Sequence, residues 1–145
     1  MGQYFENFKD ALPDVKKVRK IKKDLEKKGV KYIYSNWIDF LGSPKTKPMP
    51  ISDFEDLCMG KGPQFAVHSV SFVPELTPAD NDQIPVPDLD SLVICPWDKT
   101  CAWVFADLYW NDKPYDVCPR MTLKKQIKES AKSDFKFFVG IEPEF

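Results

Sequence analysis

Hydrophobic residues near the N-terminus recur at spacings of three, three and four: Val15, Val18, Ile21 and Leu25. Lysines fill most of the positions between them, so a helix here would have one apolar stripe and a basic outer face. Asp14 suits the N-cap of such a helix, and Gly29 suits its C-terminal stop. The pattern therefore predicts a basic amphipathic helix within residues 1–29.

Runs rich in β-branched and aromatic residues follow, and each predicts a strand: 30–40, 45–49, 65–72, 91–97 and 102–110. Pro48 lacks an N–H donor, so the second run belongs at a sheet edge or a strand end. Ser52 and Glu55 have the spacing of a capping box, which predicts a short helix before the third run. Residues 73–90 contain four prolines and five acidic groups, and we expect a long ordered loop there.

A second helix is predicted near the C-terminus. Pro119 suits its first turn, and Leu123, Ile127 and Ala131 follow at spacings of four. We expect these three residues to form its apolar stripe and its lysines to face outward. Residues 135–141, FKFFVGI, predict a final strand.

This order of elements is typical of an α+β fold. We expect a mostly antiparallel sheet with helices packed on one side, in addition to the N-terminal amphipathic helix. The chain has 145 residues, which is room for one domain. Apolar residues punctuate the proline-rich stretch, so it is not expected to be a free linker.

Charge and composition exclude several functions. The net charge is −1, although a basic excess gathers in residues 16–31. A solvated helix face explains these lysines; a nucleic-acid-binding arm is the alternative, but no aromatic interleaving or second basic strip supports it. No apolar run reaches the roughly 18 residues of a membrane span, and the N-terminus has no apolar signal core. We therefore expect a cytoplasmic protein that binds neither nucleic acid nor membrane.

The chain has four cysteines and one histidine: Cys58, Cys95, Cys101, Cys118 and His68. A structural zinc site needs four such ligands, usually in closely spaced pairs, so we expect none here. Reduced thiols packed in the core are the expected state. The chain also lacks a nucleophile elbow, a P-loop and a dinucleotide-binding fingerprint.

Two carboxylates near the C-terminus are the candidates for metal binding. Glu142 and Glu144 flank Pro143. Residues i and i+2 of a strand share a face, and the proline fixes the backbone between them. Two carboxylates held side by side repel each other unless a cation is present, and oxygen ligands favour Mg²⁺, Mn²⁺ or Ca²⁺. The alternative is that both glutamates are simply solvated.

Several motifs, in one order, resemble the glutamine synthetase family. EPEF after the last predicted strand resembles the start of that family's catalytic domain. VKYIYSNWIDFLG with KTKPMP resembles the opening of its N-terminal β-grasp domain. TPADNDQIPVPDLDSLVICPWDK and WVFADLYWNDKPYDVCPRMTLKKQI resemble its acidic loop and its strand–turn–helix segment. The resemblance covers roughly residues 29–145 and is strongest toward the branch that includes glutamate–methylamine ligase.

The resemblance implies an ATP-dependent ligase that phosphorylates glutamate and then replaces the phosphate with ammonia or an alkylamine. Glu142 and Glu144 match the family's ligands for Mg²⁺ or Mn²⁺. Ala66 stands where the family pattern has an ammonium-binding aspartate, which favours an alkylamine as the acceptor. Asp82, or Asp80 if the loop is shifted, matches a second acidic position that acts on a neighbouring subunit.

The resemblance also implies boundaries: 1–29 for the N-terminal helix, 30–139 for the β-grasp domain and 140–145 for the start of a catalytic domain. The ATP pocket and the remaining ligands would lie in that later domain, so we expect this chain alone to be inactive. In the family, the N-terminal domain walls a neighbouring subunit's active site within a homo-oligomeric ring. Lys47 matches a basic family position to which no role can be assigned. A free-standing, non-catalytic β-grasp interaction or regulatory module is the alternative.

Overall fold

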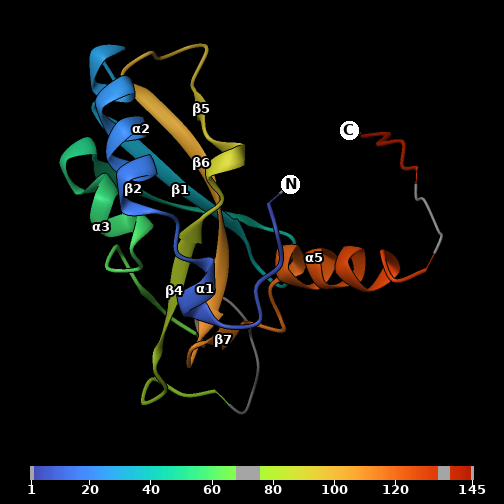
Figure 1. Cartoon of the computed structure of the whole chain (residues 1–145). Helices are drawn as coiled ribbons and strands as arrows, with labels where there is room; N and C mark the ends of the chain where they lie inside the picture. The colour runs from blue at the N-terminus through green and yellow to red at the C-terminus, as the bar shows by residue number, and fades with distance from the viewer. Residues whose placement is uncertain (1, 68–75, 134–137, 145) are drawn as a thin grey trace.

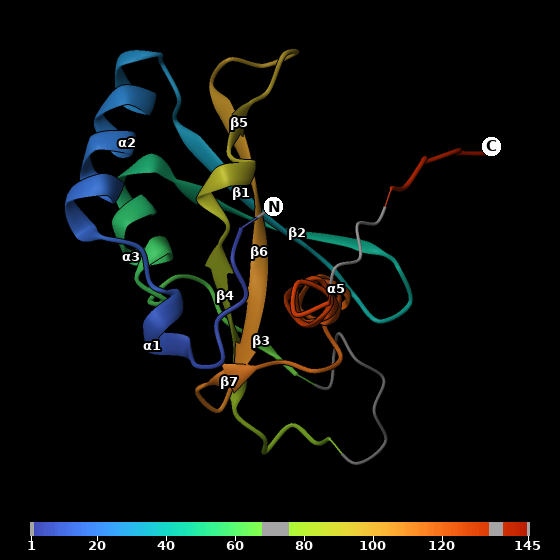
Figure 2. The same ribbon diagram turned by 45° about the vertical axis from the view of Figure 1, so that its right-hand side comes forward.

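The computed structural model describes residues 2–67, 76–133 and 138–144. Its helices are α1 (Phe8–Ala11), α2 (Val15–Lys27), η1 (Ile51–Asp53), α3 (Phe54–Cys58), η2 (Leu89–Ser91) and α5 (Pro119–Ser130). Its strands are β1 (Tyr32–Ile38), β2 (Pro44–Pro50), β3 (Phe65–Ala66), β4 (Asp82–Pro87), β5 (Val93–Ile94), β6 (Cys101–Trp110) and β7 (Lys113–Pro114). The helices α1, α2 and α3 are layered against one face of the sheet, and α5 lies on the other (Figure 1, Figure 2).

The described strands form one seven-stranded sheet in the order β2-β1-β6-β4-β3, with β5 and β7 also paired to β6. β1 and β6 run parallel, from Tyr32 opposite Cys101 to Asn36 opposite Phe105. Every other described strand pair is antiparallel. The predicted α+β class and the mostly antiparallel sheet are therefore confirmed.

The predicted basic helix is α2, and both of its ends are as expected. The Asp14 side chain accepts the Lys17 N–H at 2.9 Å, which caps the first turn. Gly29 has φ +84°, the left-handed conformation that ends helices and that glycine adopts without strain. Val18 and Leu25 are buried against the sheet, whereas the lysines are on the outer face.

The short helix after β2 is also confirmed, but its predicted capping box is wrong. α3 begins after Asp53, whose side chain makes no capping hydrogen bond. The Ser52 hydroxyl donates to the neighbouring Asp53 carboxylate at 2.7 Å instead. The single turn η1 takes up Ile51–Asp53, so the N-cap position falls on Asp53, one residue after Ser52.

The loop expected over 73–90 is wrong for its second half, because residues 82–87 form β4. The N–H of Asp88, just past β4, donates to the Phe105 carbonyl at 2.7 Å. Alternate residues of a strand repeat this direction, so the N–H groups of Ile84 and Val86 face β6, and Pro85 and Pro87 face away from it. β3 pairs only as far as Gln83, so none of the described strands needs the donors that the two prolines lack.

The remaining strand predictions differ in length from the structure. The run 91–97 contains only β5, Val93–Ile94. Of the run 65–72, β3 is Phe65–Ala66, and positions from 68 onward lie outside the described residues. The final strand is wrong for 138–141, which have no regular structure, and 134–137 lie outside the described residues.

Two hydrophobic clusters hold the layers together. One joins α2 and α3 to the sheet: Val18, Leu25, Val30, Ile33, Phe54, Leu57, Cys58, Ala102 and Val104. The other surrounds the ends of β1, β3, β4 and β6 and the start of α5: Trp37, Phe65, Val67, Val86, Leu108, Tyr109, Tyr115, Cys118 and Met121. Within residues 2–67, 76–133 and 138–144, no helix combines the length and apolar character needed to cross a membrane.

Candidate functional site

The structure brings Asp82 and Ala66 together at one corner of the sheet. Ala66 ends β3, Asp82 begins β4, and the two are direct partners in the antiparallel register. Directly opposed residues have their side chains on the same face, about 4.5–5.5 Å apart at Cβ. Asp82 is exposed, so its carboxylate is available to a ligand that approaches this corner.

A stacked pair of aromatic rings supports the same corner. The rings of Trp37 on β1 and Phe65 on β3 are parallel within 2°, with their centroids 4.2 Å apart. Lys47 of β2 donates to the Gln64 carbonyl, and its ammonium lies 5.6 Å from the Phe65 ring centroid. Lys47, to which the sequence assigned no role, therefore ties edge strand β2 to the strand that bears Ala66.

Gln83 and Trp37 place unpaired polar groups inside this corner. Gln83, adjacent to Asp82, is fully buried, and neither its Nε2 nor its Oε1 has a hydrogen-bond partner in the described part of the chain. The Trp37 indole N–H is likewise buried and unpaired there. Buried polar groups are normally satisfied, so these two residues are exceptions among the described part of the core.

Glu142 and Glu144 lie in the tail 138–144, which extends away from the β3–β4 corner (Figure 2). Both side chains are exposed, and no strand holds them. Among the described residues, no group of three or more His, Cys, Asp or Glu side chains is arranged to hold a metal ion. The structure therefore does not bring the two glutamates together with Asp82, and they could supply only part of the roughly six oxygen ligands of Mg²⁺.

The four cysteines are free and buried. Burial raises the pKa of the Cys58 thiol to about 12. Burial also raises the pKa of the Cys95 and Cys118 thiols. A thiol attacks as its thiolate, so these three groups are poorly suited to nucleophilic chemistry at neutral pH. His68 lies outside the described residues.

The predicted outer face of α5 is wrong, because one of its lysines points inward. Lys124 is 3% exposed, whereas Leu123 and Ile127 are each 48% exposed. The buried side of the helix consists of Met121 and Lys124. The inward lysine is stabilised by two carboxylates, one on β6 and one just past the end of β4.

A buried cluster of two aspartates and two basic residues joins α5 to the sheet. Lys124 Nζ lies 3.0 Å from Asp88 Oδ2 and also bonds the Asp107 carboxylate. Arg120 Nη2 lies 2.6 Å from Asp88 Oδ2, and Arg120 Nε lies 3.1 Å from Asp107 Oδ1. The Gly2 N–H donates to the same Asp88 oxygen at 3.1 Å. The side-chain charges balance, which is the condition under which ionised groups tolerate burial.

The pKa of Asp88 reflects this cluster. Burial by itself would raise it, because a buried carboxylate loses hydration. The hydrogen bonds from Lys124 and the Gly2 N–H, together with the positive charges of Lys124 and Arg120, lower it below its ordinary value. Asp88 is therefore ionised at neutral pH although only 4% of its side chain is exposed.

Inspection of the sequence missed the charge cluster, although one signal for it was present. Asp107 lies within the apolar strand CAWVFADLYW, where an isolated charge implies a buried partner. Arg120 and Lys124 lie four residues apart on one helix, which places both on the same face. The apolar spacing of Leu123, Ile127 and Ala131 instead predicted that these residues form the buried side of the helix and that Lys124 faces solvent.

Curated proteins of known function match most of the chain. Glutamine synthetase from Rhizobium meliloti (strain 1021) is 37% identical over 118 residues, which are 81% of this chain and 26% of the relative. Glutamate–methylamine ligase from Methyloversatilis universalis is 32% identical over 123 residues, 83% of this chain and 27% of the relative. Glutamine synthetase from Pyrococcus furiosus is 33% identical over 116 residues, 80% of this chain and 26% of the relative. No family model matches the chain.

Solved structures lead to the same group of proteins. A GmaS–ADP complex superposes with a TM-score of 0.70 at 27% identity, over 77% of this chain and 25% of that one. Ligand-free GmaS superposes with a TM-score of 0.71 at 27% identity, over 77% of this chain and 26% of that one. The chain thus spans about a quarter of the length of the relatives that it matches. The chain belongs to the glutamine synthetase family, in the branch that includes glutamate–methylamine ligase.

Proposed function

We propose that this chain is the N-terminal domain of an ATP-dependent glutamate–ammonia or glutamate–amine ligase. The observation that carries the proposal is the match, over about four fifths of the chain, to both glutamine synthetases and a glutamate–methylamine ligase. Glu142 and Glu144, which flank a proline, are the candidate metal ligands in this proposal, because carboxylate oxygens are the ligands that Mg²⁺ and Mn²⁺ prefer. Residues 30–139 are then the domain itself, and 140–145 begin the catalytic domain.

The proposed reaction has two steps. The γ-phosphoryl group of ATP moves to the γ-carboxylate oxygen of glutamate, which gives γ-glutamyl phosphate and ADP. The amine nitrogen then attacks the acyl carbon, the C–O bond to phosphate breaks, and one proton leaves the nitrogen as the amide forms. Mg²⁺ or Mn²⁺ would neutralise phosphate charge, and Glu142 and Glu144 would hold it with ligands from the following domain.

In this proposal, Asp82 binds the acceptor amine. Its exposed carboxylate at the β3–β4 corner would attract the ammonium form of the acceptor in the active site of a neighbouring subunit and accept one proton from it, which frees the nitrogen lone pair for the attack. Ala66 opposite it carries no charge, which leaves room for an alkyl group on the nitrogen. The arrangement requires a homo-oligomeric ring, and we place the enzyme in the cytoplasm. In this proposal the isolated 145-residue chain has no ligase activity.

A fusion protein tests the proposal. Residues 1–145 replace the matched segment of the Rhizobium meliloti glutamine synthetase, and phosphate release is measured with ATP, Mg²⁺, glutamate and either ammonia, methylamine or ethylamine. We expect amine-dependent phosphate release from the fusion and none from the chain alone. Glu144→Ala should lower kcat by at least about a hundredfold, since it removes a ligand of the ion that stabilises the transition state.

Glu129→Ala is the matched control, because Glu129 is an exposed carboxylate on α5 whose partner is the exposed Lys132. Its phosphate release should equal that of the unmodified fusion. Full turnover in Glu144→Ala, with circular dichroism showing both variants folded, would refute the metal role of the pair.

A free-standing β-grasp interaction or regulatory module is the second candidate. The observation that favours it is that Glu142 and Glu144 are exposed and grouped with no third ligand among the described residues. Sequencing the gene beyond the codon for Phe145 distinguishes the two. A reading frame that continues for several hundred codons supports the ligase, and a stop codon supports the module.

A further inference from the structure

Within the part of the chain that the structure describes, the second half of α5 buries no side chain against the sheet. The residues that the helix buries, Met121 and Lys124, both belong to its first half. Residues 125–129 are all exposed. The helix projects outward from the sheet (Figure 1). Packing against the sheet therefore fixes the start of α5 but not the direction of its last turns.

Residues 2–8, the N-terminal strap, make the contacts that the sheet does not. Lys128 Nζ lies 2.7 Å from Glu6 Oε1 and 5.4 Å from the centroid of the Tyr4 ring. This hydrogen bond and the attraction between the two charges lower the pKa of Glu6 and raise that of Lys128. Among the described residues, Lys128 thus ties the last turns of α5 to the strap through an ion pair and a ring contact.

Both ends of the strap are fixed to the body of the domain. Gly2 lies so close to Asp88 that a Cβ there would be 2.6 Å from Oδ1, so a larger residue would have to displace the Asp88 carboxylate. At the other end, the Phe8 N–H donates to the Asp112 carbonyl at 2.9 Å, and the Phe8 ring meets the edge of Tyr109. Residues 3–7 of the strap therefore run between two fixed contacts, beside residues 125–130 of α5.

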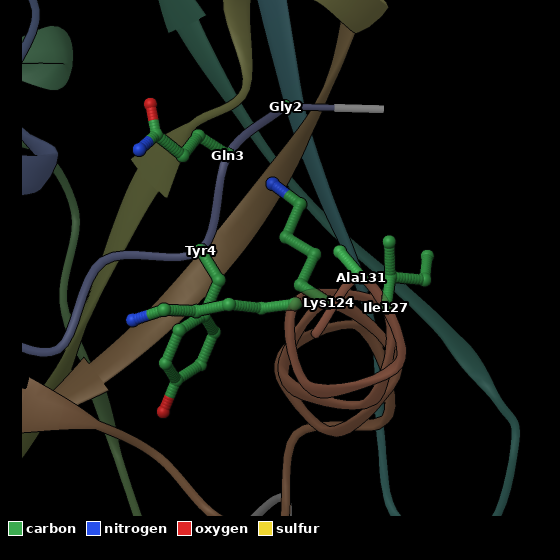
Figure 3. Close-up of a pocket in the computed structure, with 7 residues that line it drawn as sticks. Gly2, Gln3, Tyr4, Lys124, Ile127 and Ala131 are labelled. Atoms are coloured by element: carbon green, nitrogen blue, oxygen red, sulfur yellow. The ribbon is translucent and has the colours of Figure 1, made fainter. Parts of the chain in front are cut away.

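A half-open groove of about 310 Å³ separates the strap from the helix. Figure 3 shows Gln3 and Tyr4 on the side of the strap, and Ile127 and Ala131 on the helix. The strap and helix are therefore not fused by close packing here, and the contacts to Lys128 bridge them across a gap.

We propose that the N-terminal strap is a clasp that sets the direction of the second half of α5, and that it opens without unfolding the domain. The clasp is weak by construction, because 42% of the Lys128 side chain and 75% of the Glu6 side chain are exposed. An exposed ion pair of this kind should change the equilibrium between the closed and the open clasp by roughly two- to fivefold, and added salt weakens the ion pair further. Opening the clasp therefore changes the direction in which the described residues 131–133 leave α5. This inference does not depend on the ligase proposal.

Hydrogen exchange of the whole chain, measured by mass spectrometry, tests the clasp. Glu6→Gln and Tyr4→Ala should each speed amide exchange in residues 125–130 by roughly two- to fivefold, with 119–124 unchanged. Glu55→Gln is the matched control, because it removes an exposed ion pair with Arg19 far from α5. It should leave exchange in 125–130 unaltered.

The unmodified chain provides a second measurement that needs no variant. Raising the salt concentration from about 0.02 M to about 0.5 M should speed exchange in 125–130 more than in 119–124, since the ion pair is screened. The proposal is overturned if the amide exchange rate in 125–130 changes neither with salt nor with the two strap substitutions. It is equally overturned if exchange rises uniformly across α5 and β6, which would mean general destabilisation.

Discussion

Asp88 connects three parts of the chain through one side chain: the N-terminal strap, α5 and the end of β4. Its Oδ2 accepts hydrogen bonds from Gly2, Arg120 and Lys124, and the residue itself follows β4. Removing the carboxylate would leave two basic groups to share Asp107 in a buried setting. Removing one partner of a buried ion pair lowers the stability of the fold strongly, because the remaining charge stays buried without compensation.

Asp88→Asn should therefore lower the free energy of unfolding by about 3–5 kcal/mol. Urea denaturation followed by tryptophan fluorescence measures the change. Asp90→Asn is the matched control, because Asp90 is an exposed aspartate two positions along, and its effect should stay within about 0.5 kcal/mol. Equal effects of the two substitutions would mean that the cluster does not hold α5.

Acid acts on the same carboxylate. The pKa of Asp88 is lowered on folding from its ordinary value of 3.8, so its stabilising contribution is complete above that value and is lost as the pH falls through the folded pKa. The difference in unfolding free energy between the unmodified chain and Asp88→Asn should be constant between about pH 5 and 7 and shrink below about pH 4. A constant difference down to about pH 2 contradicts this assignment.

Ala66→Asp should place a second carboxylate directly opposite Asp82. Like charges at facing positions should lower the stability of the isolated chain by roughly 0.2–1 kcal/mol. In the fusion protein, the added charge should shift acceptor preference from methylamine toward ammonia, measured as the ratio of kcat/KM values. Ala66→Asn, similar in size but uncharged, is the control. An unchanged ratio in Ala66→Asp removes Ala66 from the acceptor site.

At this scale, residues with local roles were predictable from the sequence and those with distant partners were not. Asp14 and Gly29 act within one helical turn of their own positions, so the sequence around them is sufficient. Lys124 bonds Asp107 and Asp88, which are 17 and 36 residues away. Its inward direction depends on a fold that brings those carboxylates under the helix, and helical periodicity holds no information about them.

At the scale of the elements, Gly29 at the end of α2 allows the contribution of a helix end to the free energy of unfolding to be predicted. Gly29 has φ +84° with no atom within 4 Å of where a Cβ would stand, so only backbone conformation restricts the position. Gly29→Ala should therefore cost about 1–2 kcal/mol of unfolding free energy. Thermal melts of both variants measure the change. Gly140→Ala is the control, because a Cβ there also meets open space but its φ is not positive, and its unfolding free energy should not change measurably. Similar losses at both positions would contradict this explanation.

The elements missed by the sequence were those that depend on neighbours. β4 was assigned to a loop because of its prolines, yet Pro85 and Pro87 face the side on which no strand pairs with them. Sequence alone cannot say which side of a strand is paired, so it cannot tell a tolerated proline from a disruptive one. The strand expected over 135–141 has no partner in the described residues 138–144, because strand propensity does not supply a neighbouring strand.

For the whole molecule, the two hydrophobic clusters are complete without the tail. Phe138, Val139 and Ile141 are 92%, 84% and 88% exposed, so they contribute nothing to either cluster. Changing all three to serine should leave the melting temperature within about 2 °C. It should also reduce self-association on size-exclusion chromatography, because exposed apolar segments promote aggregation.

The control for this prediction is Ile33→Ser, which alters a fully buried residue in one cluster. That single change should lower the melting temperature by at least about 10 °C. If the tail substitutions destabilise the chain comparably, the tail packs against the domain in solution and is not extended.

β6 pairs with four other strands, and its parallel pairing with β1 spans residues 39–100 of intervening chain. On a ribosome that adds about 5–20 residues per second, β1 waits on the order of 3–12 s for its partner to be made. During that time α2 and the β1–β2 hairpin have no sheet to cover, and their apolar faces are open to chaperones or to other nascent chains. The central strand thus sets the earliest moment at which this domain can fold during its synthesis.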